Sequence, residues 1–273
     1  MSISTELNIK KHKKFSSLKE LNSFLLNLFN LINIVKGFED IKYIIYGGAI
    51  RDILLEKSLN DIDLSLFFQN SKEFRSDELH SRLLTISEFS ESFSGFKINI
   101  ERKKLDYSLL KMHINLPNNF FVNIDITSSN TKKICDFTVN NLQYQHSIGL
   151  HTIIKGTYDI TQSIKDIYTK TLRFVSDIKC LTFCERTKLA ERSNKMIDKG
   201  FKYDINEYEK EPFLDISNEN KICPICQYDD NKDKMYYLCS TCNASYHLHC
   251  ANKYILNSSN QNIEIINCPS CRQ

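Results

Sequence analysis

Residues 43–52 read Tyr-Ile-Ile-Tyr-Gly-Gly-Ala-Ile-Arg-Asp, and residues 60–64 read Asn-Asp-Ile-Asp-Leu. The four residues that open the first segment predict a short buried strand. Gly47 and Gly48 then allow the backbone to turn sharply and to approach a ligand closely. We expect a helix from about Ala49, so that free backbone N–H groups face whatever lies beyond the glycines. Such a helix start favours a bound phosphate.

The second segment carries a pair of carboxylates. On a strand, alternation places Asp61 and Asp63 on one face and Ile62 and Leu64 on the other. Two like charges side by side are unfavourable unless a hard divalent cation such as Mg²⁺ compensates them. With the glycine turn before it, this pair predicts a site for a metal-bound nucleoside triphosphate. The alternative is an ordinary buried strand, a turn and a solvated acidic loop.

The order Gly-Gly-x-x-Arg-Asp followed by Asp-x-Asp resembles the poly(A) polymerase head and the class II CCA-adding tRNA nucleotidyltransferases. The resemblance implies a polymerase-beta-like head in which Asp61 and Asp63 hold two catalytic Mg²⁺ ions. One departure is Glu56, because many members of the family carry a glycine at this position. The residues of the first segment that the resemblance assigns to nucleotide binding are Gly47, Gly48, Arg51 and Asp52.

A third carboxylate is expected on the segment 120–127, which alternates as a strand and places Asn123 and Asp125 on one face. Asp125 could join the pair, help bind metal, or accept the proton of an attacking 3′-hydroxyl. A solvated aspartate on a strand face is the alternative.

Residues 135–142 resemble the next motif of the family, which helps to hold the ribose and phosphates of the nucleotide. Asp136 and Asn140 match the motif, and the resemblance assigns both to nucleotide binding. The two arginines of the family are replaced by Ile134 and Cys135, with Lys132 and Lys133 just upstream. A helix capped at Asp136 is the alternative.

The remaining patterns predict an α+β fold with a mixed sheet and flanking helices. A capping box at Ser17 opens an apolar helical repeat that continues to Val35. Residues 96–100 and 109–114 alternate as strands, whereas residues 69–95 are mixed and mostly helical in pattern.

Composition limits the setting of the protein. The chain has 273 residues and a net charge of +3, which is too small to indicate nucleic-acid binding by itself. Neither an apolar run of membrane length nor a signal peptide is recognisable, so we expect an intracellular protein, cytoplasmic or nuclear, without a membrane partner. Abundant Asn, Ile and Lys are typical of an AT-rich genome, such as that of a large DNA virus or a protist.

Cysteines gather at the C-terminal end of the chain, where a reducing compartment favours metal binding over disulfides. Their spacing is Cys-x2-Cys, x12, Cys-x2-Cys, x4, His-x2-Cys, x17, Cys-x2-Cys. Eight ligands in four pairs predict two structural Zn²⁺ sites without an open position. The ligands are Cys223, Cys226, Cys239, Cys242, His247, Cys250, Cys268 and Cys271. His249 is a competing ligand, and spacing favours His247.

This spacing resembles a RING finger of the C4HC3 type, also called RING-CH. PHD fingers share the ligand order but usually carry a Trp before the last pair, and this chain has none. The resemblance implies a cross-brace, with Cys223, Cys226, His247 and Cys250 on one ion and Cys239, Cys242, Cys268 and Cys271 on the other. It also implies a surface that docks a ubiquitin-conjugating enzyme, formed by Ile225, Tyr254, Pro269 and Arg272. A purely structural zinc clip is the alternative.

We therefore predict a nucleotidyltransferase domain over residues 1–201, a polar linker over 202–220 and a RING-type finger over 221–273. The first functional hypothesis is template-independent transfer from an NTP to an RNA 3′ end, of tRNA or another RNA. The second is a RING-type ubiquitin ligase whose head binds a substrate or an RNA without chemistry.

Overall fold

The computed structural model describes residues 11–36, 41–68, 97–102, 108–128, 136–154, 158–175, 181–204, 213, 222–228, 234–242, 244–260 and 266–272. Contacts group the chain into two compact units, Met1–Tyr168 and Thr169–Gln273. The boundaries predicted at residues 201 and 221 both fall inside the second unit. The helical pattern at 69–95, Ile134 and Cys135, and most of the proposed linker lie outside the described residues.

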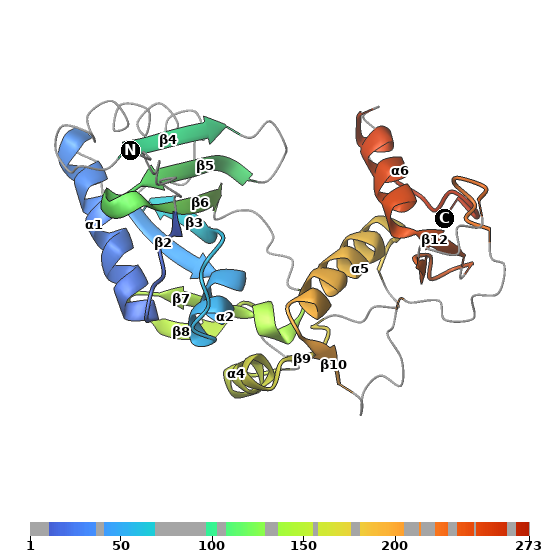
Figure 1. Cartoon of the computed structure of the whole chain (residues 1–273), viewed down its shortest axis with the longest axis horizontal. Helices are drawn as coiled ribbons and strands as arrows, with labels where there is room; N and C mark the ends of the chain where they lie inside the picture. The colour runs from blue at the N-terminus through green and yellow to red at the C-terminus, as the bar shows by residue number, and fades with distance from the viewer. Residues whose placement is uncertain are drawn as a thin grey trace, which may run out of the picture. The chain divides into compact units, whose positions relative to one another are not determined.

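The first unit is built on a mixed sheet (Figure 1). Its strands are β1 (Lys11–His12), β2 (Ile41–Tyr46), β3 (Ile62–Phe68), β4 (Lys97–Arg102), β5 (Ser108–Asn115), β6 (Phe120–Ser128), β7 (Leu142–Gln145) and β8 (Gly149–Thr152). The order is β4-β5-β6-β3-β2-β7-β8, and β1 pairs with β6. Strands β3 and β6 run parallel, whereas β2 is antiparallel to both of its neighbours. The predicted α+β fold with a mixed sheet is confirmed.

The helices and helical turns of this unit are α1 (Leu18–Lys36), α2 (Gly48–Leu54), η1 (Pro117–Asn119), η2 (Thr138–Asn140) and α4 (Ile160–Thr169). Helix α1 packs on the sheet, because Leu21 and Leu25 are fully buried and Phe29 stacks on Tyr43 of β2. The Tyr43 hydroxyl also donates to Asn22 Oδ1 at 2.8 Å. The predicted amphipathic helix is therefore confirmed, and its role is structural.

The start of α1 differs in detail from the predicted capping box. Ser17 Oγ accepts from the Glu20 amide at 3.2 Å, as expected. The Glu20 carboxylate, however, accepts from the amide and the hydroxyl of Ser16, not from the Ser17 amide. These two bonds lower the pKa of Glu20 and place its negative charge at the helix start, where the helix dipole favours it.

Alternation along the strands separates two faces of the sheet. Leu64, Met112 and Ile124 are fully buried on the apolar face. The opposite face carries the polar residues of the same strands, including Lys111, which is half-buried. Since a register slip of one residue would exchange the faces, the hydrophobic pattern fixes which side chains stand on the polar face.

Helix α2 ends in a left-handed residue. Glu56 has φ 53° and is exposed, its amide donates to the Ile53 carbonyl, and the Lys57 amide donates to the Asp52 carbonyl. This pair of bonds is a Schellman motif, in which glycine is the usual residue at the position of Glu56. A glycine at this position would adopt the same conformation without the steric cost of a Cβ.

We predict that Glu56→Gly raises the free energy of unfolding by about 1 kcal/mol, because glycine removes the cost of the left-handed conformation. The melting temperature should rise by roughly 2–4 °C in a scanning calorimetry experiment. Glu56→Ala is the matched control, since it removes the same carboxylate but keeps a Cβ. An equal gain from the alanine variant would show that charge, not backbone conformation, is responsible.

The second unit holds β9 (Thr171–Leu172), α5 (Phe183–Asp198), β10 (Lys202–Tyr203), β11 (Met235–Tyr237), β12 (Ser245–His247) and α6 (Leu248–Asn260). Strands β9 and β10 pair in parallel, and β11 and β12 form an antiparallel ribbon. Helix α5 begins with a complete capping box between Thr182 and Glu185.

Helix α5 shares its core with the cysteine-rich segment. Phe183 meets Tyr246 of β12 edge-on, with ring centroids 5.3 Å apart. Arg186 Nη2 donates to the Tyr237 carbonyl at 3.1 Å, and Asn194 Nδ2 donates to the Tyr236 hydroxyl at 2.9 Å. Helix α5 is therefore part of the same packed body as β11 and β12.

Among the described residues, no helix combines the length and the apolar character that crossing a bilayer requires.

Candidate functional site

Two of the carboxylates predicted from the sequence, Asp63 and Asp125, lie in one cross-strand row on the polar face of the sheet. Tyr46 of β2 pairs with Asp63 of β3, and Asp63 pairs in parallel register with Asp125 of β6. Asp125 in turn pairs with Lys111 of β5, which pairs with Glu101 of β4. The structure thus brings Asp125 beside Asp63, where directly opposed side chains of adjacent strands are close enough to interact.

The glycine turn lies against this row. Gly47 has φ 71°, a conformation that favours glycine, and a Cβ built on it would lie 3.6 Å from Asp63 Oδ2. Its amide donates to the Leu142 carbonyl at 3.0 Å. This bond joins the turn to β7, so the Gly47 amide is already engaged by the protein. Helix α2 begins at Gly48, one residue earlier than predicted.

Asp61 lies one residue before β3 and is exposed. The backbone beside it is held by Asn123 of β6, whose Nδ2 donates to the Asn60 carbonyl at 3.2 Å. Asn123 Oδ1 in turn lies 2.6 Å from His113 Nδ1 on β5. This chain of contacts ties the loop that carries Asp61 to the same sheet face as Asp125.

Tyr46 adds a neutral phenol to the row. Its hydroxyl lies 3.1 Å from Thr127 Oγ1, two residues beyond Asp125 on β6. Burial, together with the negative charges of Asp63 and Asp125, raises the pKa of Tyr46 to about 12. The hydroxyl therefore stays protonated near neutral pH and adds no third negative charge to the row.

Arg51 stands behind the glycine turn in a buried polar network. Its side chain is 5% exposed, its Nε donates to Asp52 Oδ1 at 2.7 Å, and its Nη1 donates to Asn140 Oδ1 at 2.6 Å. A Cβ on Gly48 would lie 3.2 Å from Arg51 Nη2, so the guanidinium fills the space that this glycine leaves. The absence of a side chain at Gly48 therefore makes room for the side chain of Arg51.

Asp136 completes this network. Its Oδ1 accepts from Asn140 Nδ2 at 3.0 Å and from the Phe137 amide at 2.9 Å. The segment forms the short turn η2, not the α-helix capped at Asp136 that was the alternative. The structure thus joins four residues predicted from the sequence, Arg51, Asp52, Asp136 and Asn140, into one group beside the glycine turn.

Several supporting residues had no signal in the sequence. Thr138 donates to Asp166 Oδ2 of α4 at 2.7 Å, and Asp166 is 1% exposed. Asn141 holds the Ile154 amide and carbonyl through its side chain. Strand alternation could have placed Lys111 on a polar face, but only the register shows that Lys111 and Asp125 are opposite each other.

The acidic residues suit a hard cation. Mg²⁺ prefers carboxylate oxygens and is usually held by one or two carboxylates, with phosphates and water completing its shell. Asp63 and Asp125 offer such oxygens side by side, next to a turn without a Cβ, and Asp61 lies two residues before Asp63. These residues could therefore hold a divalent ion together with a phosphorylated ligand.

The second unit contains two candidate metal centres of four residues each. One centre is formed by Cys223, Cys226, His247 and Cys250, and the other by Cys239, Cys242, Cys268 and Cys271. Within each centre all the ligand atoms lie within 4.8 Å of one another. The grouping is the one that the cross-brace resemblance implies, and His249 is not in either group.

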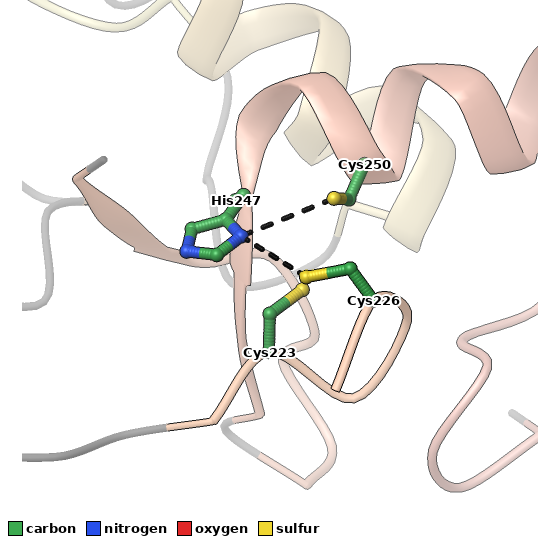
Figure 2. Close-up of side chains that lie close together, drawn as sticks. All are labelled: Cys223, Cys226, His247 and Cys250. Carbon is green, nitrogen blue, oxygen red and sulfur yellow. Dashed lines mark hydrogen bonds between the residues drawn. The ribbon is translucent and has the colours of Figure 1, made fainter. Parts of the chain in front are cut away.

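Figure 2 shows the first centre, where the imidazole of His247 at the end of β12 faces two sulfurs. Its Nδ1 lies 3.4 Å from Cys226 Sγ and 3.9 Å from Cys250 Sγ. In the second centre the Cys239–Cys271 and Cys242–Cys268 sulfurs are 3.6 and 3.7 Å apart. A tetrahedral Zn²⁺ with bonds of about 2.3 Å to sulfur places its sulfurs about 3.8 Å apart, so the spacing fits.

Electrostatics of the second centre also favours a cation. Burial opposes ionisation of Cys239, but the amides of Cys242 and Thr241 outweigh it and lower the pKa of Cys239 to about 7. Burial and the neighbouring sulfurs raise the pKa of Cys242 to about 12. Four thiolates cannot coexist here without a positive ion, and metal binding would release the remaining protons.

The hydroxyl of Tyr246 contacts a candidate ligand of the second centre. The Tyr246 hydroxyl lies 2.9 Å from Cys268 Sγ and donates to Ser270 Oγ at 2.7 Å. Tyr246 is fully buried and carries the contact with Phe183 of α5. The packing of α5 is therefore linked to the position of a candidate ligand.

Residues assigned to a docking surface are placed as follows. Ile225 and Pro269 are half-buried beside the ligands, and Arg272 is exposed with φ 59°. Tyr254 of α6 is half-buried and meets Phe183 of α5 edge-on, with ring centroids 6.2 Å apart. Part of the Tyr254 ring is therefore covered by α5.

The comparison with protein families matches the part of the chain that carries the carboxylate row. Residues 42–173 match the Poly A polymerase head domain. This range contains β2 to β9, and so the glycine turn, Asp61, Asp63, Asp125 and the network around Arg51. The match covers the site of the first unit, and it does not include the two cysteine centres. No curated protein sequence matches the chain.

Solved structures give low similarity scores. The Thermotoga maritima CCA-adding enzyme complexed with tRNA is 18% identical, with a TM-score of 0.40, and the match covers 69% of this chain and 40% of that one. A CCA-adding enzyme with ATP is 16% identical, with a TM-score of 0.39 and coverage of 68% and 41%. A tRNA-processing enzyme is 16% identical, with a TM-score of 0.41 and coverage of 70% and 46%. The chain thus spans less than half of the length of these proteins.

We predict that the purified full-length chain holds two Zn²⁺ ions, one for each centre, by elemental analysis. Cys242→Ser should reduce the content by about one ion and destabilise the second unit, because structural zinc contributes directly to folding. Cys184→Ser is the matched control, since Cys184 lies on α5 outside both centres. An unchanged content in Cys242→Ser would exclude the second centre as a zinc site.

Proposed function

We propose that the first unit is a template-independent nucleotidyltransferase that adds nucleotides from an NTP to an RNA 3′ end. The observation that carries the proposal is the register of Asp63 and Asp125 beside Gly47, within a segment that matches the Poly A polymerase head domain. A CCA-adding enzyme in complex with tRNA and one with ATP are among the similar structures. RNA and an NTP are accordingly the partners that we propose.

Asp61, Asp63 and Asp125 would hold the Mg²⁺ ions, which supply Lewis acidity for the attacking hydroxyl and for the pyrophosphate that leaves. The RNA 3′-hydroxyl would attack the α-phosphate in line. Asp125 stands beside Asp63 and could take the proton of this hydroxyl. The sheet itself would contribute preorganisation, because two adjacent strands hold the two aligned carboxylates before substrate binds.

The residues around Arg51 would shape the nucleotide site. Gly47 would leave room for the triphosphate and Gly48 leaves room for the Arg51 guanidinium, while Arg51 and Asp52 fix the turn that carries both glycines. Asp136 and Asn140 stand next to this turn and could contact the ribose. Because Arg51 is already paired with Asp52, we propose that it acts on the nucleotide through the turn it supports.

The transfer assay uses the full-length chain, labelled NTPs, Mg²⁺ and a mixture of RNAs. We expect metal-dependent extension of an RNA 3′ end, reduced at least 10³-fold in Asp61→Asn with Asp63→Asn, because the metal ligands are lost. Asp198→Asn is the matched control, because it makes the same substitution at the end of α5, far along the chain from the site. Extension undiminished in the double variant, or no extension with any NTP, would refute the proposal.

A second candidate function rests on the two cysteine centres, whose grouping of ligands is the one that a cross-braced RING finger would need. We propose that they bind Zn²⁺ and recruit a ubiquitin-conjugating enzyme through Ile225, Tyr254, Pro269 and Arg272. The reduced cysteines that these centres need agree with the intracellular setting expected from the sequence.

Self-ubiquitination with a panel of conjugating enzymes tests the second candidate. We expect ubiquitin chains that are lost in Ile225→Ala, with the zinc content unchanged, because the side chain is not a ligand. Leu256→Ala serves as the control, because Leu256 is an apolar residue of the same unit that is exposed and is not assigned to the docking surface. If no conjugating enzyme gives chains, the centres are a structural or binding module only.

A further inference from the structure

A lysine that no motif predicts stands next to Asp125 in the cross-strand row. Lys111 of β5 stands opposite Asp125, and its Nζ lies 3.8 Å from Asp125 Oδ1. Both side chains are largely enclosed, with exposed fractions of 26% for Lys111 and 16% for Asp125. A partly enclosed ion pair is screened less by solvent and salt than a surface pair.

The other charged groups of this face frame the pair. Glu101 follows Lys111 in the row. His113 belongs to the neighbouring row, and its Nε2 lies 3.8 Å from Glu101 Oε2. On the other side Asp63 follows Asp125. The guanidinium of Arg51 is engaged by Asp52 and Asn140 behind the glycine turn. Lys111 thus brings a positive charge to the side of Asp125 that faces away from Asp63.

We propose that Lys111 is an internal counter-ion of the metal site: it orients Asp125 and weakens the binding of free divalent ions. This inference rests on the proposed function, because it assumes that Asp63 and Asp125 bind the metal. A cation bound to Asp125 would be repelled by the positive charge of Lys111, and charges at such short range interact more strongly near a protein surface than in bulk water. A divalent ion on Asp125 would meet this repulsion with twice the charge.

The consequence is a site that discriminates between a bare ion and an ion carried by a nucleotide. A metal-bound triphosphate brings its own negative charge, which compensates the lysine, whereas a free ion does not. Lys111 is therefore a positioning residue, because it acts through Asp125 and not on the reacting atoms. Its removal should strengthen metal binding while it harms transfer.

The experiment measures Mn²⁺ binding to the zinc-loaded, nucleotide-free full-length chain by electron paramagnetic resonance of the free ion. We expect Lys111→Met to bind Mn²⁺ about tenfold more tightly than the natural chain, since a repelling charge is lost. Lys111→Arg keeps the charge and should restore the natural affinity. In the transfer assay, Lys111→Met should lower kcat with little change in KM for the NTP.

Lys97→Met is the matched control. Lys97 lies on the same face at the far end of β4, opposite Asn115, which pairs with Phe121. Phe121 is four residues from Asp125 along β6, or about 13 Å, so the same loss of charge should change Mn²⁺ affinity less than twofold.

Each result separates this inference from the proposed function. Unchanged or weaker Mn²⁺ binding in Lys111→Met, with binding that depends on Asp63, overturns the role of Lys111 alone. Absence of binding in both the natural chain and Lys111→Met overturns the metal site and this inference together. Tighter binding in Lys111→Met that disappears when Asp63→Asn is added supports the inference.

Discussion

The first unit depends on holding two carboxylates side by side across a parallel strand pair. Asp63 and Asp125 occupy directly opposed positions of β3 and β6, where like charges repel. The fold accepts this cost because the apolar residues next to them in the chain, Leu64 and Ile124, are completely buried on the other face. Hydrophobic packing against α1 thus fixes a register that electrostatics alone would disfavour.

A buried hydrogen-bond network holds the glycine turn beside these carboxylates. Arg51, Asp52, Asn140 and Asp136 form a buried network between α2 and η2, and the Gly47 amide links the turn to β7. A buried charge is tolerated when it is paired and hydrogen-bonded, as Arg51 is. The glycine turn is therefore fixed by its surroundings before any ligand arrives, which reduces the reorganisation needed on binding.

Sequence reasoning predicted the elements that repeat locally and missed those that depend on register. The helix from Leu18, the strands around Asp63 and Asp125, and the eight metal-ligand candidates all follow from short-range spacing. The Lys111–Asp125 pair, the Thr138–Asp166 bond and the use of the Gly47 amide join segments far apart in the chain. No local pattern encodes which residue of one strand faces which residue of another, so these contacts required the structure.

The shared core of α5 and the cysteine ribbon has a consequence for how this protein can be divided. A fragment that begins in the polar stretch before Cys223 would not keep the packing of the cysteine-rich segment. Tyr246 would lose its contact with the ring of Phe183, and the Tyr237 carbonyl would lose its hydrogen bond from Arg186. The compact unit that contains this core begins at Thr169, ahead of both β9 and α5. An exchange of the cysteine-rich segment between proteins during evolution would therefore have had to include α5.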